Sequence, residues 1–67
     1  MKDYTNSQIS ALIDEHIHNQ MHRTVMRLRF IDGMTYESIA EHPDVDRTPR
    51  QVANIISKNV LRIEKYL

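Results

Sequence analysis

The sequence lacks cysteine and tryptophan, and its 67 residues include only one glycine, two prolines and one phenylalanine. Without cysteine, neither a disulfide framework nor a thiolate metal site can form, and this composition is typical of a reducing cytosol. No stretch is as long and apolar as a membrane helix requires, and the N-terminal region has no signal-peptide core. We therefore expect a soluble, cytoplasmic protein that does not insert into membranes.

The short length leaves room for only one small core. We expect a single domain, residues 1–67, with little space for a catalytic cleft shielded from water. The sequence shows no Ser/His/Asp set, no paired buried carboxylates and no glycine-rich phosphate loop. His18 and His22 have i, i+4 spacing, but Asn19 between them is expected to break the helix. These features predict a binding protein, not an enzyme, with no metal and no cofactor.

The net charge is zero, but the charges are distributed unevenly. Up to Asp46 there are four Lys or Arg residues against eight Asp or Glu residues, and from Arg47 onward there are five against one. The C-terminal third is therefore basic, which predicts one surface for an anionic partner. The alternative is that these charges only solvate the surface.

Hydrophobic periodicity predicts an all-α fold of four helices. The first predicted helix covers about residues 6–18, where Thr5 and Gln8 have the spacing of a capping box. The second covers about residues 22–31 and ends at Gly33, which tolerates the left-handed conformation common after a helix.

The other two predicted helices are separated by a polar turn. The third covers about residues 35–42, with Thr35 as its expected N-cap, and it must end there because Pro43 pushes the residue before it out of the helical region. The fourth covers about residues 48–66, and Thr48 and Gln51 have the spacing of a second capping box. A short helix, a turn and a longer helix with a polar, basic first half together predict a helix-turn-helix.

The fourth predicted helix is amphipathic. Its apolar side comprises Val52, Ile56, Val60, Ile63 and Leu67, and its polar side comprises Arg50, Asn54, Lys58 and Lys65. Arg can form two hydrogen bonds with guanine, Asn or Gln can do so with adenine, and Ser, Thr or Lys can hold phosphates. We therefore expect this polar side to face the major groove of duplex DNA.

The central segment also resembles a known family. The stretches RLRFIDG and MTYESIAE, residues 27–41, together with PRQV and IIS further on, resemble region 4 of bacterial sigma factors. The resemblance runs from near His22 to near Ile63 and is strongest to small sigma-like proteins of phages and mobile elements in Gram-positive bacteria. The segment from Ala40 to Val52 is slightly longer than that family's usual spacing. The chain has no counterpart of the other sigma regions, so we expect a transcriptional regulator or accessory factor.

The resemblance implies specific DNA contacts. In that family the start of the recognition helix reads the promoter −35 element, and the start of the preceding helix lies near the phosphate backbone. The expected base-reading residues are Arg47, Arg50, Gln51 and Asn54, and the expected phosphate contacts are Thr35, Tyr36, Thr48, Ser57 and Lys58. Arg62, further along the helix, is either a phosphate contact or a solvated charge. Gln51 could instead cap the helix through Thr48, and the sequence leaves these two roles open.

A protein partner is the competing expectation. Leu61 falls on the polar side of the fourth predicted helix, where an isolated exposed leucine is common but can also mark an interface. With Tyr66 and Leu67 it could form a homodimer contact, as in many helix-turn-helix proteins. The same scaffold could also dock on RNA polymerase or inhibit a host protein, which the low net charge and the acidic first half favour.

Overall fold

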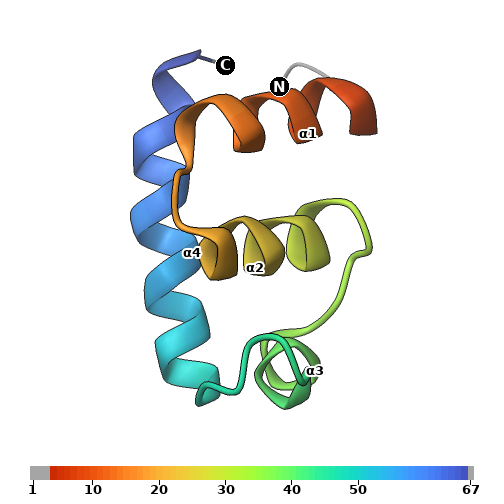
Figure 1. Cartoon of the computed structure of the whole chain (residues 1–67), viewed down its shortest axis with the longest axis vertical. Helices are drawn as coiled ribbons and strands as arrows, with labels where there is room; N and C mark the ends of the chain where they lie inside the picture. The colour runs from red at the N-terminus through yellow and green to blue at the C-terminus, as the bar shows by residue number, and fades with distance from the viewer. Residues whose placement is uncertain (1–3, 67) are drawn as a thin grey trace.

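The computed structural model describes residues 4–66, which form four α-helices and a short 3₁₀-helix with no strand in this range. The elements are α1 (Asn6–His16), α2 (Gln20–Phe30), α3 (Tyr36–Glu41), α4 (Pro49–Ile63) and η1 (Glu64–Tyr66). The all-α prediction is therefore confirmed. Within the described range, none of the helices is both long and apolar enough to cross a bilayer. Figure 1 shows α4 along one side, with α1 and α2 crossing it one above the other and α3 near its N-terminal end.

Threonine side chains begin three of the helices, as predicted. Thr5 and Gln8 form a complete capping box, with Gln8 N–H donating to Thr5 Oγ1 at 3.2 Å and Thr5 N–H to Gln8 Oε1 at 2.8 Å. Thr48 and Gln51 form the second predicted box at the start of α4, and Thr35 caps α3. These caps satisfy backbone N–H groups that have no partner inside a helix, so the helix starts are encoded locally.

The boundary between the first two helices differs from the prediction. Helix α1 ends at His16, and the next residue, Ile17, is extended and fully buried. Asn19 does not break a helix but begins one, since its side chain accepts a hydrogen bond from His22 N–H at 3.1 Å. Helix α2 therefore begins at Gln20, before the predicted start. Burial of Ile17 and capping by Asn19 together account for the shift.

The connection between α3 and α4 is only partly the expected polar turn. Helix α3 ends before Pro43 as predicted, and the His42 carbonyl accepts hydrogen bonds from Val45 N–H at 3.0 Å and Asp46 N–H at 3.1 Å. Asp46 has a positive φ of 48°, a conformation that Asp adopts more readily than most residues. Within the predicted polar turn, residues 43–47, Val45 is the exception, since it is 2 % exposed and belongs to the core. The turn therefore anchors α4 as well as connecting it.

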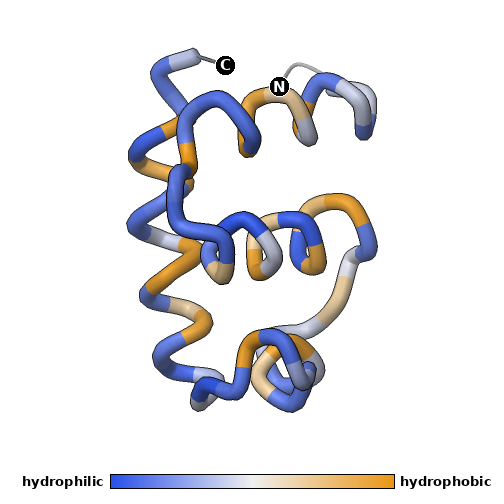
Figure 2. The backbone as a smooth tube through the Cα atoms, in the orientation of Figure 1, coloured by the Kyte–Doolittle hydropathy of each residue, from blue (hydrophilic) through white to orange (hydrophobic). Residues whose placement is uncertain are grey.

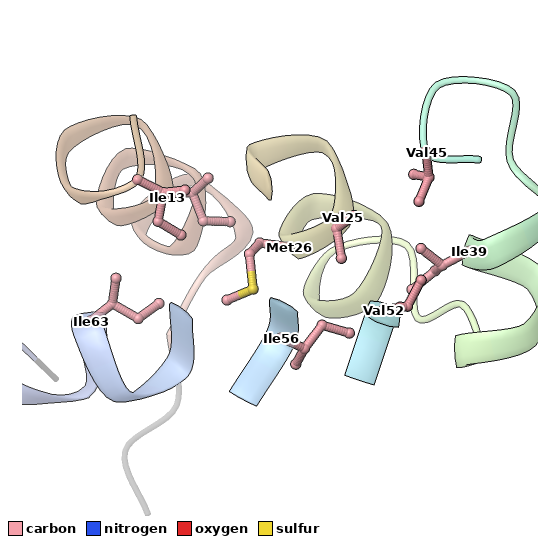
Figure 3. Close-up of a cluster of buried hydrophobic side chains, with 9 residues drawn as sticks. Ile13, Val25, Met26, Ile39, Val45, Val52, Ile56 and Ile63 are labelled. Carbon is pink, nitrogen blue, oxygen red and sulfur yellow. The ribbon is translucent and has the colours of Figure 1, made fainter. Parts of the chain in front are cut away.

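Helix α4 organises the core because it packs against each of the other three α-helices. The buried hydrophobic side chains are Ile13, Ile17, Val25, Met26, Ile39, Val45, Val52, Ile56 and Ile63. Figure 3 shows Met26 in the middle of this cluster, with Ile13 and Ile63 to one side and Val25 and Ile56 to the other. Figure 2 shows apolar and polar stretches alternating along α4, as expected for an amphipathic helix.

A polar contact joins α1 and α2. The Arg27 guanidinium donates to Ser10 Oγ at 3.2 Å and forms an ion pair with Asp14.

Beyond α2, Gly33 has a φ of +70°, which confirms the left-handed residue predicted there.

Candidate nucleic-acid interface

The side of α4 that faces away from the core carries an exposed polar strip, formed by Arg50, Asn54 and Ser57. Successive members are four and three residues apart, so they share one face at 100° per residue. The opposite face carries the buried Val52 and Ile56. Within residues 4–66, the side chains of the polar strip make no hydrogen bond or ion pair. They are therefore available to an external partner.

Positive charges lie beside the polar strip. Lys58 and Arg62 are exposed and one helical turn apart on α4. Arg47, in the turn before α4, is folded back: its Nη1 donates to the Asp46 carbonyl at 3.0 Å and to the Val45 carbonyl at 3.3 Å. Some of the Arg47 hydrogen-bond donors are therefore already engaged by the turn, whereas Lys58 and Arg62 donate to no turn carbonyl.

The expected DNA contacts Thr48 and Gln51 bind each other. Gln51 N–H donates to Thr48 Oγ1 at 3.2 Å, and Gln51 Oε1 accepts from Thr48 N–H at 3.1 Å and from the Thr48 hydroxyl at 3.3 Å. This is the capping alternative that the sequence left open. The amide oxygen of Gln51, which two-point recognition of adenine requires, is occupied in this arrangement.

Thr35 and Tyr36 lie at the start of α3, which packs against α4. Thr35 Oγ1 accepts from Ser38 N–H at 3.1 Å and donates to Ser38 Oγ at 3.0 Å. The Tyr36 ring faces the Arg29 guanidinium, whose Cζ is 4.7 Å from the ring centroid. No hydrogen bond within the described residues joins this pair to the polar strip.

The residues expected at a partner contact have different environments. Leu61 is 67 % exposed and lies on α4 one turn beyond Ser57. Tyr66 instead stacks on His16 of α1, with ring centroids 3.7 Å apart. Leu67 lies outside the described residues. Only Leu61 among them is shown as a free apolar side chain.

An apolar pocket of about 250 Å³ was not foreseen from the sequence. It is lined by Tyr4, Ile9, Leu12, Ile13, Phe30, Val60 and Ile63. Phe30, at the end of α2, is 42 % exposed at this place. Apart from Tyr4, which precedes α1, the lining comes from α1, α2 and the apolar side of α4, so the pocket is not part of the polar strip. Within residues 4–66 the His, Asp and Glu side chains form no group of three that could hold a metal ion.

A contact between two further polar residues, Asn59 and His22, was not predicted from the sequence. Asn59 is 2 % exposed, and its Nδ2 lies 3.3 Å from Nδ1 of His22 on α2. The position of Asn59, three residues after Ile56 and four before Ile63, already assigns it to the buried face of α4. Its polarity concealed this role.

The polar strip offers a guanidinium, an amide and a hydroxyl in order along one helix face. These groups can hydrogen-bond base edges and phosphate oxygens without any rearrangement of the core. Comparison with known protein families, curated proteins and solved structures gives no match to this chain.

Proposed function

We propose that this protein is a sequence-specific duplex DNA-binding transcriptional regulator in which α3 and α4 act as a helix-turn-helix. The observation that carries the proposal is the polar strip of α4, whose Arg50, Asn54 and Ser57 are exposed and have no partner within residues 4–66. A helix of this diameter fits the major groove. The resemblance of residues 27–41 to sigma factor region 4 supports the same function.

In this proposal, the role of each DNA-contacting residue follows from the hydrogen bonds that its side chain makes in the structure. Arg50 and Asn54 contact base edges, because both are unengaged and one turn apart. Ser57 and Lys58 contact phosphates, and Arg47 does so after releasing the turn carbonyls that it now binds. Thr48 and Gln51 act mainly by fixing the start of α4.

The test is selection of bound duplexes from a random DNA pool by the purified protein at two salt concentrations. We expect an enriched motif whose binding weakens with salt, because phosphate contacts release counterions. Arg50→Lys is the matched control: it keeps the positive charge but loses the planar fork that recognises guanine. It should retain binding to random DNA and lose the preference for the motif. Failure to enrich any motif at either salt concentration contradicts the proposal.

A protein-binding module on the same scaffold is the second candidate. It is favoured by Leu61, which is 67 % exposed, and by Phe30, which is 42 % exposed beside the apolar pocket. The partner of such a module would be RNA polymerase or a host protein that a mobile element modulates. Leu61→Ser separates the candidates, because it should abolish a protein complex and leave DNA binding almost unchanged.

A further inference from the structure

A buried amide joins α2 to the core-facing side of α4, opposite the polar strip. Asn59 Nδ2 donates to the carbonyl oxygen of Ile55 at 2.8 Å. The same nitrogen lies 3.3 Å from Nδ1 of His22. An amide NH₂ group has two hydrogens, so it can serve both acceptors at once.

This arrangement determines which nitrogen of His22 carries the proton. If the amide were turned over, Asn59 Oδ1 would face the Ile55 carbonyl, and two acceptors would repel each other. Nδ2 therefore stays toward Ile55, and Nδ1 of His22 has to accept a hydrogen bond. In a neutral imidazole the proton then resides on Nε2. This Nε2–H has no hydrogen-bond partner within residues 4–66.

Three cations act on this imidazole. Burial lowers the pKa of His22, and the charges of Lys58, Arg62 and Arg47 lower it further. Within the described part of the chain none of these three cations forms an ion pair, and no carboxylate contributes to the shift. The site therefore combines unpaired cations with a neutral, oriented N–H donor, which is an environment that attracts anions.

We propose that His22 Nε2–H, together with Lys58 and Arg62, binds a phosphate oxygen of the DNA backbone at the flank of α4, between its core-facing side and the polar strip. The inference rests on the proposed function, since it names a phosphate contact for the same helix. Lys58 directly precedes Asn59 and Arg62 follows it by three residues, and Asn59 holds the imidazole against α4. The two cations neutralise the phosphate, while the neutral N–H directs one oxygen. No proton is transferred, and the contact sets the register of α4 on any duplex.

Two substitutions separate this role from a structural one. His22→Asn places an amide oxygen near the position of Nδ1, so it keeps an acceptor for Asn59 and loses the outer donor. His22→Gln places an amide N–H near the position of Nε2, so it keeps the outer donor and loses the acceptor. A histidine that only braces the helices tolerates Asn better, whereas a phosphate-binding histidine tolerates Gln better.

The first measurement is binding of the full chain to the enriched duplex and to a random-sequence duplex, at a temperature where all variants are folded. We expect His22→Asn to weaken both complexes about three- to tenfold while its thermal unfolding stays near that of the parent. His22→Gln should bind both duplexes within about twofold of the parent and melt at a lower temperature. Parental affinity in His22→Asn, or the reverse order of the two variants, overturns the phosphate site.

The second measurement needs no DNA sequence. Inorganic phosphate is titrated at constant ionic strength, with chloride as the control, while NMR follows the ring nitrogens of His22. A bound phosphate offsets the neighbouring cations, so the pKa of His22 should rise toward its ordinary value and the Nε2 signal should shift. An unchanged His22 overturns the site even where a DNA motif is enriched. A responding His22 without any enriched motif supports the site and overturns the sequence-specific function.

Discussion

The ring of Tyr66 stacks on the imidazole of His16, with centroids 3.7 Å apart and planes 7° from parallel. This contact joins η1 to the end of α1, so the last described turn of the chain is attached to the first helix. An aromatic residue expected at an external interface therefore makes an internal contact.

Removing the stack should loosen the C-terminal end. We expect Tyr66→Ala to lower the free energy of unfolding by about 0.5–1.5 kcal/mol, the contribution typical of aromatic pairs. Tyr66→Phe is the control, since it keeps the ring and should unfold like the parent. Urea denaturation followed by circular dichroism measures both. Equal stability of the Ala variant would show that the stack contributes nothing.

The capping box at the start of α4 predicts a coupled loss. Thr48→Ala should cost about 1 kcal/mol, the usual effect of losing an N-cap side chain. Gln51→Ala breaks the same reciprocal pair, so the double variant should be less destabilised than the two single losses added together. Thr48→Ser keeps the cap and serves as the control. Additive losses in denaturation experiments would contradict a shared box.

The burial of His22 predicts a pH dependence of stability. Its pKa in the folded protein lies below its ordinary value of 6.5, so the unfolded chain binds the extra proton first as pH falls. The contribution of neutral His22 to the free energy of unfolding is fully present above pH 6.5 and is lost as the pH falls toward the folded-state pKa. Protonation also places a donor on Nδ1, opposite the Asn59 amide. Urea denaturation between about pH 7.5 and pH 5 measures the effect, above the range where carboxylates titrate.

The control for this pH dependence is His22→Asn, which has no titrating group at that position. Its stability should change less than that of the parent over the same pH range. Parallel curves for the two proteins would assign the effect to other residues.

The polar strip predicts two kinds of DNA-binding variant. Arg50→Ala and Asn54→Ala should each lose about 1 to 3 kcal/mol on the enriched motif, with little loss on random DNA. Lys58→Ala should weaken both duplexes similarly and reduce the salt slope by about one. Fluorescence anisotropy at several salt concentrations measures these changes. Equal losses on both duplexes for all three variants would argue against base recognition.

The sequence predicts the elements of this fold better than their contacts. Thr5, Thr35 and Thr48 begin helices as expected, because capping involves residues only three positions apart. The end of α1 could not be located in this way. It depends on the burial of Ile17 against helices that come later in the chain. It also depends on Asn19, because asparagine is equally compatible with ending one helix and with capping the start of the next.

The candidate site shows the same division. Exposure of Arg50 and Asn54 follows from the 3.6-residue period of α4. The partners of Arg47 and Tyr66 do not follow from it. The folded-back guanidinium of Arg47 depends on the irregular conformation of the turn that precedes it, and the stack of Tyr66 on His16 depends on distant backbone. The contact between His22 and Asn59 spans two helices and is likewise invisible to local patterns.

The two sides of α4 have separate roles, one in packing and one in the proposed binding. One side packs against all three other helices, and the other carries the polar strip, without any side chain serving both. A library that randomises positions 50, 54 and 57 therefore leaves every buried contact unchanged. The chain is consequently suited to acquiring new binding preferences by selection, because variants at these positions share one scaffold and differ only in the surface that they present.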